Sequence, residues 1–135
     1  MKTKSVLDQQ DVQKILDAAA AHATQNNWAV TIAVTDDGGH LLGLKRLDGA
    51  APISAHIAPA KAHTAALSQR ETKGYEDMIN NGRVSFLSAP AIEGMLEGGV
   101  PVIVDGQTIG AVGVSGVQAS QDAEIAKAGI AAIAA

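Results

Sequence analysis

The sequence predicts an α+β fold in which helices cover a mostly antiparallel sheet. Three observations support this fold class. Apolar residues recur every three or four positions near the two ends of the chain, as in amphipathic helices. Short β-branched or alternating stretches lie between them, and Asp105-Gly106 is a typical two-residue hairpin turn. With 135 residues and neither a repeat nor a linker, residues 1–135 are predicted to form a single domain.

The first predicted helix runs from about Gln9 to Gln25. Asp8 is suited to the N-cap position, and Leu7 and Val12 have the spacing of a hydrophobic staple. Asn26-Asn27 can leave the helix in a left-handed conformation. The apolar stripe that should face the core comprises Val12, Ile15, Leu16, Ala19 and Ala23.

Two antiparallel strands are expected next, Trp28–Thr35 and His40–Arg46, joined by a turn at Asp36–Gly39. One face of the first strand carries large side chains, from Trp28 to Val34. The other face carries only Ala29, Thr31, Ala33 and Thr35. The small face predicts close packing of a helix or of another subunit.

A second helix is predicted after the loop that ends at Pro52, reaching about Lys73. Pro59 lacks an amide hydrogen, so the regular helix should either begin near Ala58 or be kinked. Gly74–Asn81 should add a short helical turn. A stripe of small residues should let the long helix lie close to a sheet: Ala58, Ala62, Ala65 and Ala66.

The C-terminal part predicts three more strands and a helix. Met95–Glu97 is interpreted as a short strand, followed by the hairpin of Val100–Val104 and Gln107–Val114. Glycines 110 and 113 point to opposite faces of the last strand, which predicts close contacts on both sides. The last helix should run from about Ala119 to the C-terminus, with Ser120 as its N-cap.

Composition excludes several classes of function. The formal net charge is −4 and the longest basic run is Lys45-Arg46, which argues against nucleic-acid binding. Aromatic residues are only 2%, so stacking platforms for single strands are missing. The chain has no cysteine, which removes disulfides and thiolate metal sites. With no apolar run of membrane-spanning length and no signal peptide evident, the expected location is cytoplasmic.

Nucleotide-binding motifs do not occur in the glycine-rich stretch from Gly98 to Gly116. Its glycines do not spell G-x-G-x-x-G, and Val117 stands where a P-loop would need lysine. Ser115 superficially resembles a nucleophile elbow, but a turn hydroxyl that satisfies backbone groups is the preferred interpretation. The start of the last helix, after Gly116, is still a candidate site for a small anion.

The same stretch, together with others, resembles the GlcG/HbpS-like haem-binding family, whose related domain forms the C-terminal part of PduO-type proteins. The blocks span most of the chain in order. Those in the N-terminal half are Ile32–Asp36 with Gly39-His40-Leu41, Arg46–Ala50, and Ile57-Ala58 with Lys61–Ala65. Those in the C-terminal half are Gly98–Val102, Gly106, Ile109–Gly116, Gln121-Asp122 and Ile125–Gly129.

The resemblance implies a profilin-like fold with a five-stranded antiparallel sheet flanked by helices. It also implies assembly into dimers and often octamers, and haem as a cofactor in some members, with redox-sensing or haem-degrading roles. Other members accompany glycolate or diol catabolism. Pro59 departs from the usual residue of its block.

Histidines are the natural candidates for a haem iron ligand. His56, near the start of the second helix and close to the Arg46–Ala50 loop, is the preferred candidate, and His22 on the first helix is the next. His40 directly follows a turn and is interpreted as structural. His63 shares the second helix with His56 at a spacing of seven residues, which Pro59 disturbs.

Two basic residues extend the candidate site. Lys61 lies among alanines, where partial desolvation would favour amine chemistry or anion binding; the alternative is a lysine that reaches solvent or pairs with Asp36 or Asp48. Arg46 and Asp48 could pin their loop together, or Arg46 could hold a carboxylate or haem propionate.

Three functions therefore stand side by side. The first is a haem- or tetrapyrrole-binding protein that uses His56, His22 and Arg46. The second is an accessory protein or enzyme for a small hydroxy acid or carbonyl compound, which uses Arg46, Lys61 as candidate catalytic residue, and the helix start at Ser115-Gly116. The third is an oligomeric scaffold without small-molecule chemistry.

Overall fold

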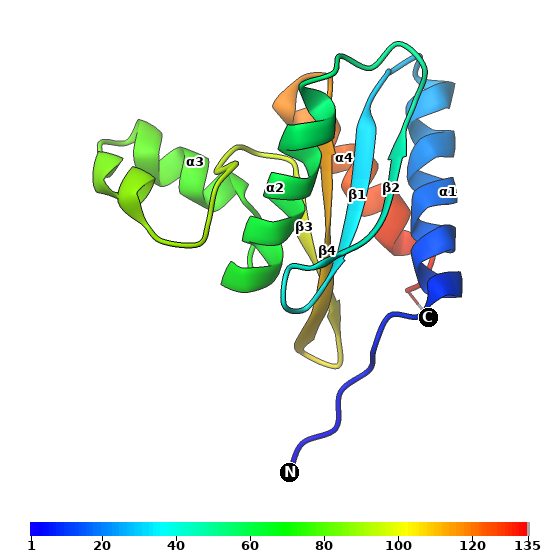
Figure 1. Ribbon diagram of the computed structural model, residues 1–135, viewed down its shortest axis with the longest axis horizontal. Coiled ribbons are helices and arrows are strands. Elements are labelled where there is room, and N and C mark those ends of the chain that lie inside the picture. The colour runs from blue at the N-terminus through cyan, green and yellow to red at the C-terminus, as the bar shows by residue number, and fades with distance from the viewer. Residues whose placement is uncertain (135) are drawn as a thin grey trace.

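The computed structural model describes residues 1–134 and confirms the α+β class. Helices and strands follow one another along the chain as Figure 1 shows. The helices are α1 (Gln9–Gln25), α2 (Ser54–Ser68), α3 (Lys73–Asn80), the 3-10 helix η1 (Val84–Ser88) and α4 (Ala119–Ala131). The strands are β1 (Thr31–Asp36), β2 (Leu41–Arg46), β3 (Gly99–Val104) and β4 (Gln107–Ser115).

The four strands form one antiparallel sheet in the order β2-β1-β4-β3. Helices α1 and α4 pack against each other on one face of the sheet, and α2 lies on the other face (Figure 1). The larger core fills the space under α1 and α4, with Ile15, Ile32 and Ile125 fully buried. Under α2 the packing uses alanines, as the small-residue stripe predicts: Ala33, Ala58, Ala62, Ala65, Ala66 and Ala111.

The hairpin between β3 and β4 agrees with the sequence. Asp105 and Gly106 both have positive φ, 52° and 74°, as a type I′ turn requires. Gly113 faces α2 so closely that a Cβ atom would lie 2.1 Å from the carbonyl oxygen of Ala58. Gly110 faces the other side, where a Cβ would lie 2.6 Å from Leu7. The predicted close contacts on both faces of β4 are therefore present.

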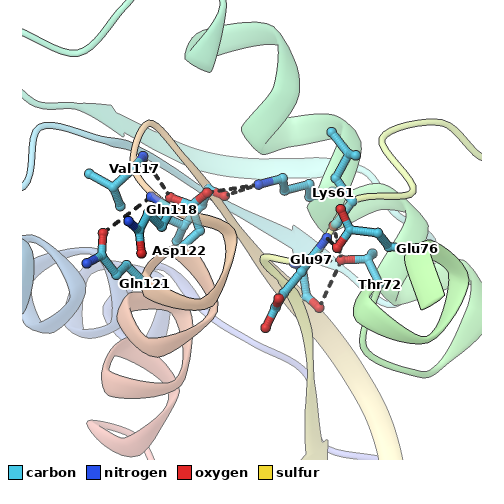
Figure 2. A network of polar contacts seen from close by, with 11 residues as sticks. Lys61, Thr72, Glu76, Glu97, Val117, Gln118, Gln121 and Asp122 are labelled. Carbon is cyan, nitrogen blue, oxygen red and sulfur yellow. Dashed lines mark hydrogen bonds and ion pairs between the residues drawn. The ribbon is translucent and has the colours of Figure 1, made fainter. Parts of the chain in front are cut away.

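The prediction of five strands is wrong: the sheet in residues 1–134 has four. The chain near Met95–Glu97 bends instead, between two glycines with positive φ, Gly94 and Gly98. Side chains, and not a neighbouring strand, form hydrogen bonds with the backbone there (Figure 2). Thr72 Oγ1 donates to the carbonyl of Leu96 (2.5 Å), and Glu76 accepts the amide of Glu97 (3.3 Å).

The second helix ends at an earlier residue than predicted, and it begins before Ala58. It stops at Ser68, because Gln69 adopts the left-handed conformation (φ 57°), and α3 follows as a separate helix. It starts at Ser54 with Pro59 inside the helix, which excludes the first of the two predicted alternatives, a start near Ala58. Ile53 is the N-cap residue of α2 and makes no side-chain hydrogen bond to the helix. Backbone hydrogen bonds to the preceding turn hold the first residues of the helix instead.

The remaining bounds differ by a few residues. β1 begins at Thr31 and β2 at Leu41, because turns with their own hydrogen bonds precede them. Asp8 caps α1 as predicted. Gln118, not Ser120, occupies the N-cap of α4, since it exchanges hydrogen bonds with Gln121. The last helix ends at Ala131, short of the C-terminus, and residue 135 lies outside the described residues. Across residues 1–134, the helices are too short or too polar to cross a bilayer.

Candidate functional site

One end of the sheet gathers most of the residues that the sequence singled out. At this end, β2 finishes with Arg46 and β4 with Ser115. Helices α2 and α4 begin at the same end of the sheet, and α1 finishes there (Figure 1). The sheet nevertheless separates them, because α1 and α4 lie on one face and α2 on the other. His22 on α1 and His56 on α2 thus lie on opposite faces and do not form a pair within one chain.

Three of the four histidines are engaged by other groups. His22 Nε2 lies 2.6 Å from Glu124 Oε2, joining α1 to α4. His40 Nδ1 lies 3.1 Å from Asp36 Oδ1 at the β1–β2 turn, in the structural position expected for it. Both ring nitrogens of His63 lie against backbone carbonyls, of Gly39 (2.9 Å) and Ala91 (3.0 Å).

His56 is the exception. Its side chain is exposed in the first turns of α2, and it has no hydrogen-bond partner within residues 1–134. A ring nitrogen of this imidazole can therefore donate its lone pair to a ligand without first giving up an interaction. Among the four histidines, His56 is the one without a hydrogen-bond partner within residues 1–134.

The outer face of α2 surrounds this imidazole with apolar groups. The helix buries Ala58, Ala62 and Ala65 against the sheet, so its opposite side points away from it. Ile53 is 60% exposed at the start of that side and Leu67 is 41% exposed at its end. The residues of this outer face follow a spacing of three and four: Ile53, His56, Ala60, His63 and Leu67.

Arg46 stands at the end of β2, beyond the loop that leads into α2. Its Nε and Nη2 atoms donate to the carbonyl of Ala50, at 3.3 and 2.9 Å. The partner that holds Arg46 in its loop is thus the carbonyl of Ala50, whereas the predicted partner was Asp48. The side chain of Arg46 is exposed.

Lys61 is buried and paired, with a partner that the sequence did not indicate. Its Nζ atom lies 3.2 Å from Asp122 Oδ2 and donates to the carbonyl of Val114 at 2.9 Å (Figure 2). Both charged side chains are only 4% exposed. The predicted alternatives, a lysine that reaches solvent or pairs with Asp36 or Asp48, are therefore wrong. The pair connects α2 to α4 past the end of β4.

Asp122 is the residue that sequence reasoning missed. Its place in the first turn of α4 suits the helix dipole, which explains an acid there without invoking Lys61. Asp122 Oδ1 also accepts the amide of Val117 at 3.2 Å. Burial raises the pKa of this carboxyl above its ordinary value of 3.8, and the positive charge of Lys61 opposes that rise. The only signal in the sequence was a lysine among alanines, which predicts desolvation of Lys61 but does not identify Asp122 as its partner.

Ser115 and Gly116 serve packing at the turn into α4. Gly116 has φ 144°, and a Cβ atom there would lie 2.5 Å from the carbonyl oxygen of Ala29. The amides of Val117 and Gln118, just before α4, donate to the side chains of Asp122 and Gln121 in its first turn. Two of the amides next to the expected anion site are thus engaged within the chain.

A cleft of about 550 Å³ lies at the other end of the molecule, where α2 meets the β1–β2 turn. Its size is within the range of small-molecule sites, about 300–1,000 Å³. Thr35 on β1 and His63 on α2 contribute its polar side chains together with Glu93. Its full lining is Thr35, Gly39, Leu41, Pro59, Ala60, His63, Leu87, Ala89, Ala91, Ile92 and Glu93.

Comparison with known proteins shows which family this chain resembles. Residues 7–131 match the model of a family described as haem degrading protein HbpS-like. The chain belongs to the HbpS-like family. It is 62% identical over 115 residues to protein GlcG of Escherichia coli K12, a stretch that covers 85% of each protein. The resemblance that the sequence blocks indicate is thus confirmed.

Solved structures of HbpS-like relatives have the same fold. The structure of a PduOC–haem complex superposes with a TM-score of 0.86 at 28% identity, covering 96% of each chain. A double mutant of HbpS from Streptomyces reticuli superposes with a TM-score of 0.89 at 28% identity, covering 100% of this chain and 92% of that one.

Proposed function

We propose that this protein binds haem on the outer face of α2, with His56 as the iron ligand. The observation that carries the proposal is the exposed imidazole of His56, which has no partner within residues 1–134 while His22, His40 and His63 are engaged. The family description and the haem complex of a relative support haem as the ligand class.

The residues around His56 suit a haem. Ile53, which is 60% exposed and lies three residues before His56, offers apolar surface against which a macrocycle can pack. Arg46, oriented by the Ala50 carbonyl, is available for a propionate through its planar fork. When bound, haem would supply an iron centre that can change oxidation state or bind a further ligand.

Self-association is proposed alongside haem binding, as a dimer or octamer. It is supported by leucines that stay exposed on β2, an edge strand of the sheet: Leu41 (54%), Leu42 (43%) and Leu44 (40%). Apolar side chains on an open edge favour pairing with another chain. Sedimentation velocity of the purified chain checks this, and a purely monomeric profile at micromolar concentration contradicts it.

Chemistry on a small hydroxy acid at Lys61 has less support. The ammonium group is buried, salt-bridged to Asp122, and hydrogen-bonded to Val114. A substrate would have to break that pair before reaching the amine. The structure of the buried pair favours a connection between α2 and α4 over a reacting group.

Titration with haemin tests the proposal. The wild-type chain should show a saturable change of the Soret band, and His56→Ala should lose it or weaken it at least tenfold. His22→Ala and His40→Ala are matched controls that remove an imidazole elsewhere and should bind like the wild type. Saturation that is unchanged in His56→Ala would overturn the ligand assignment. A wild-type titration without saturation would overturn haem binding itself.

A further inference from the structure

We propose that the cleft between α2 and the β1–β2 turn binds a small apolar molecule carrying a neutral oxygen, a hydroxyl or carbonyl, and that Thr35 is its hydrogen-bond partner. The cleft adjoins the proposed haem site along α2, but His56, the proposed iron ligand, does not line it. The two proposals can therefore fail independently.

The hydroxyl of Thr35 carries the inference. Thr35 is 1% exposed, and its Oγ1 atom has no hydrogen-bond partner in residues 1–134. A buried hydroxyl without a partner costs stability, so native proteins nearly always satisfy such groups. Thr35 also lines the cleft, which makes the cleft the direction from which a partner can come.

A second threonine on the same strand shows the ordinary arrangement. Thr31 lies four residues earlier on the same face of β1 and is fully buried. Its Oγ1 atom is 2.8 Å from Ser54 Oγ on α2, so this hydroxyl is satisfied inside the chain. The contrast indicates that Thr35 differs from Thr31 by lacking a partner inside the chain, and not by its strand or its burial.

The lining of the cleft restricts the chemistry of the ligand. Leucine, isoleucine, proline and alanine side chains supply most of its walls, which favours an apolar body. Lysine and arginine are not among the lining residues, and the charged residue present is Glu93. A carboxylate or phosphate would therefore meet neither lysine nor arginine there. His63 has a carbonyl oxygen against each ring nitrogen, so the hydroxyl of Thr35 is the buried side-chain group of the lining that lacks a partner within residues 1–134.

A matched set of ring compounds tests the proposal by chemical-shift titration of the isotope-labelled chain. Cyclohexanol and cyclohexanone present one neutral oxygen on the same apolar body. Methylcyclohexane presents none, and cyclohexanecarboxylate presents a charge. We expect the alcohol or the ketone to shift resonances of residues around the cleft, and to bind at least threefold more tightly than the other two, as one added hydrogen bond allows.

Two variants of similar shape complete the test. Thr35→Val should bind the favoured compound about three- to tenfold more weakly, and its melting temperature should equal or exceed that of the wild type. Thr31→Val should lower the melting temperature, because it removes the buried hydrogen bond between Thr31 and Ser54, and should leave binding unchanged.

Three results would overturn the proposal. The first is equal binding of cyclohexanol and methylcyclohexane, which indicates that water alone satisfies Thr35. The second is unchanged affinity in Thr35→Val. The third is the absence of binding by every compound in the set.

Discussion

Breaking the buried pair of Lys61 and Asp122 should be one of the most damaging single changes that this chain can undergo. Lys61→Met removes one charge and leaves the carboxylate of Asp122 in a site where only 4% of the side chain is exposed. Loss of one partner of a buried ion pair costs about 3–5 kcal/mol. Since domains of this size are stable by about 5–15 kcal/mol, about a fifth or more of the free energy of unfolding should disappear.

Removing both partners should cost less than the two single changes added together. The carbonyl of Val114 accepts from Lys61, and the amide of Val117 donates to Asp122. The double variant with Lys61→Met and Asp122→Leu strands no charge and leaves only these two backbone groups without their partners. It should therefore lose about 2–4 kcal/mol.

Urea denaturation of the wild type, both single variants and the double variant measures these free energies of unfolding. The melting temperature of each single variant should fall by about 10–20 °C. Lys127→Met serves as the control, because its ion pair with Glu71 leaves more than half of the lysine side chain exposed and should contribute little. Single variants within about 1 kcal/mol of the wild type would refute the reasoning.

Three further predictions follow from named contacts. The stability of the wild type relative to Asp122→Asn should decrease as pH rises from 3.8 through the raised pKa of Asp122. The reason is that the folded state holds the proton of this carboxyl more tightly than the unfolded state does. Urea denaturation from about pH 4 to pH 7 checks the sign, and an opposite slope contradicts it. Gly113→Ala should destabilise the chain by about 2–4 kcal/mol in the same assay, since its Cβ would clash with α2 at Ala58. Gln69→Gly should instead stabilise it by about 0.5–1 kcal/mol by relieving the left-handed conformation; a lower melting temperature would count against that account.

Local patterns made much of the fold predictable. Asp8 caps α1 where the sequence placed it, and Asp105-Gly106 forms the expected turn, because both depend on neighbours within a few residues. Glycines 110 and 113 indicated close contacts on both faces of β4 for the same reason. The family blocks extended these local predictions to most of the chain.

Long-range contacts explain what the sequence could not predict. Thr72 satisfies the backbone near Leu96 from 24 positions away, which turned an expected strand into a bend. Asp122 meets Lys61 across 61 positions, and no local pattern joins them. The missing partner of Thr35 is likewise a property of the packed cleft, since the alternation of β1 predicts only that this side chain faces α2.

The most direct test of the proposed haem site is to locate the residues that bound haemin contacts on the folded chain. Paramagnetic broadening of amide resonances by bound ferric haemin maps the contact without altering any residue. We predict that broadening centres on Ile53–Ala60 at the outer face of α2 and spares the side of the sheet covered by α1 and α4. Broadening centred on His22 and Glu124 would contradict the central claim.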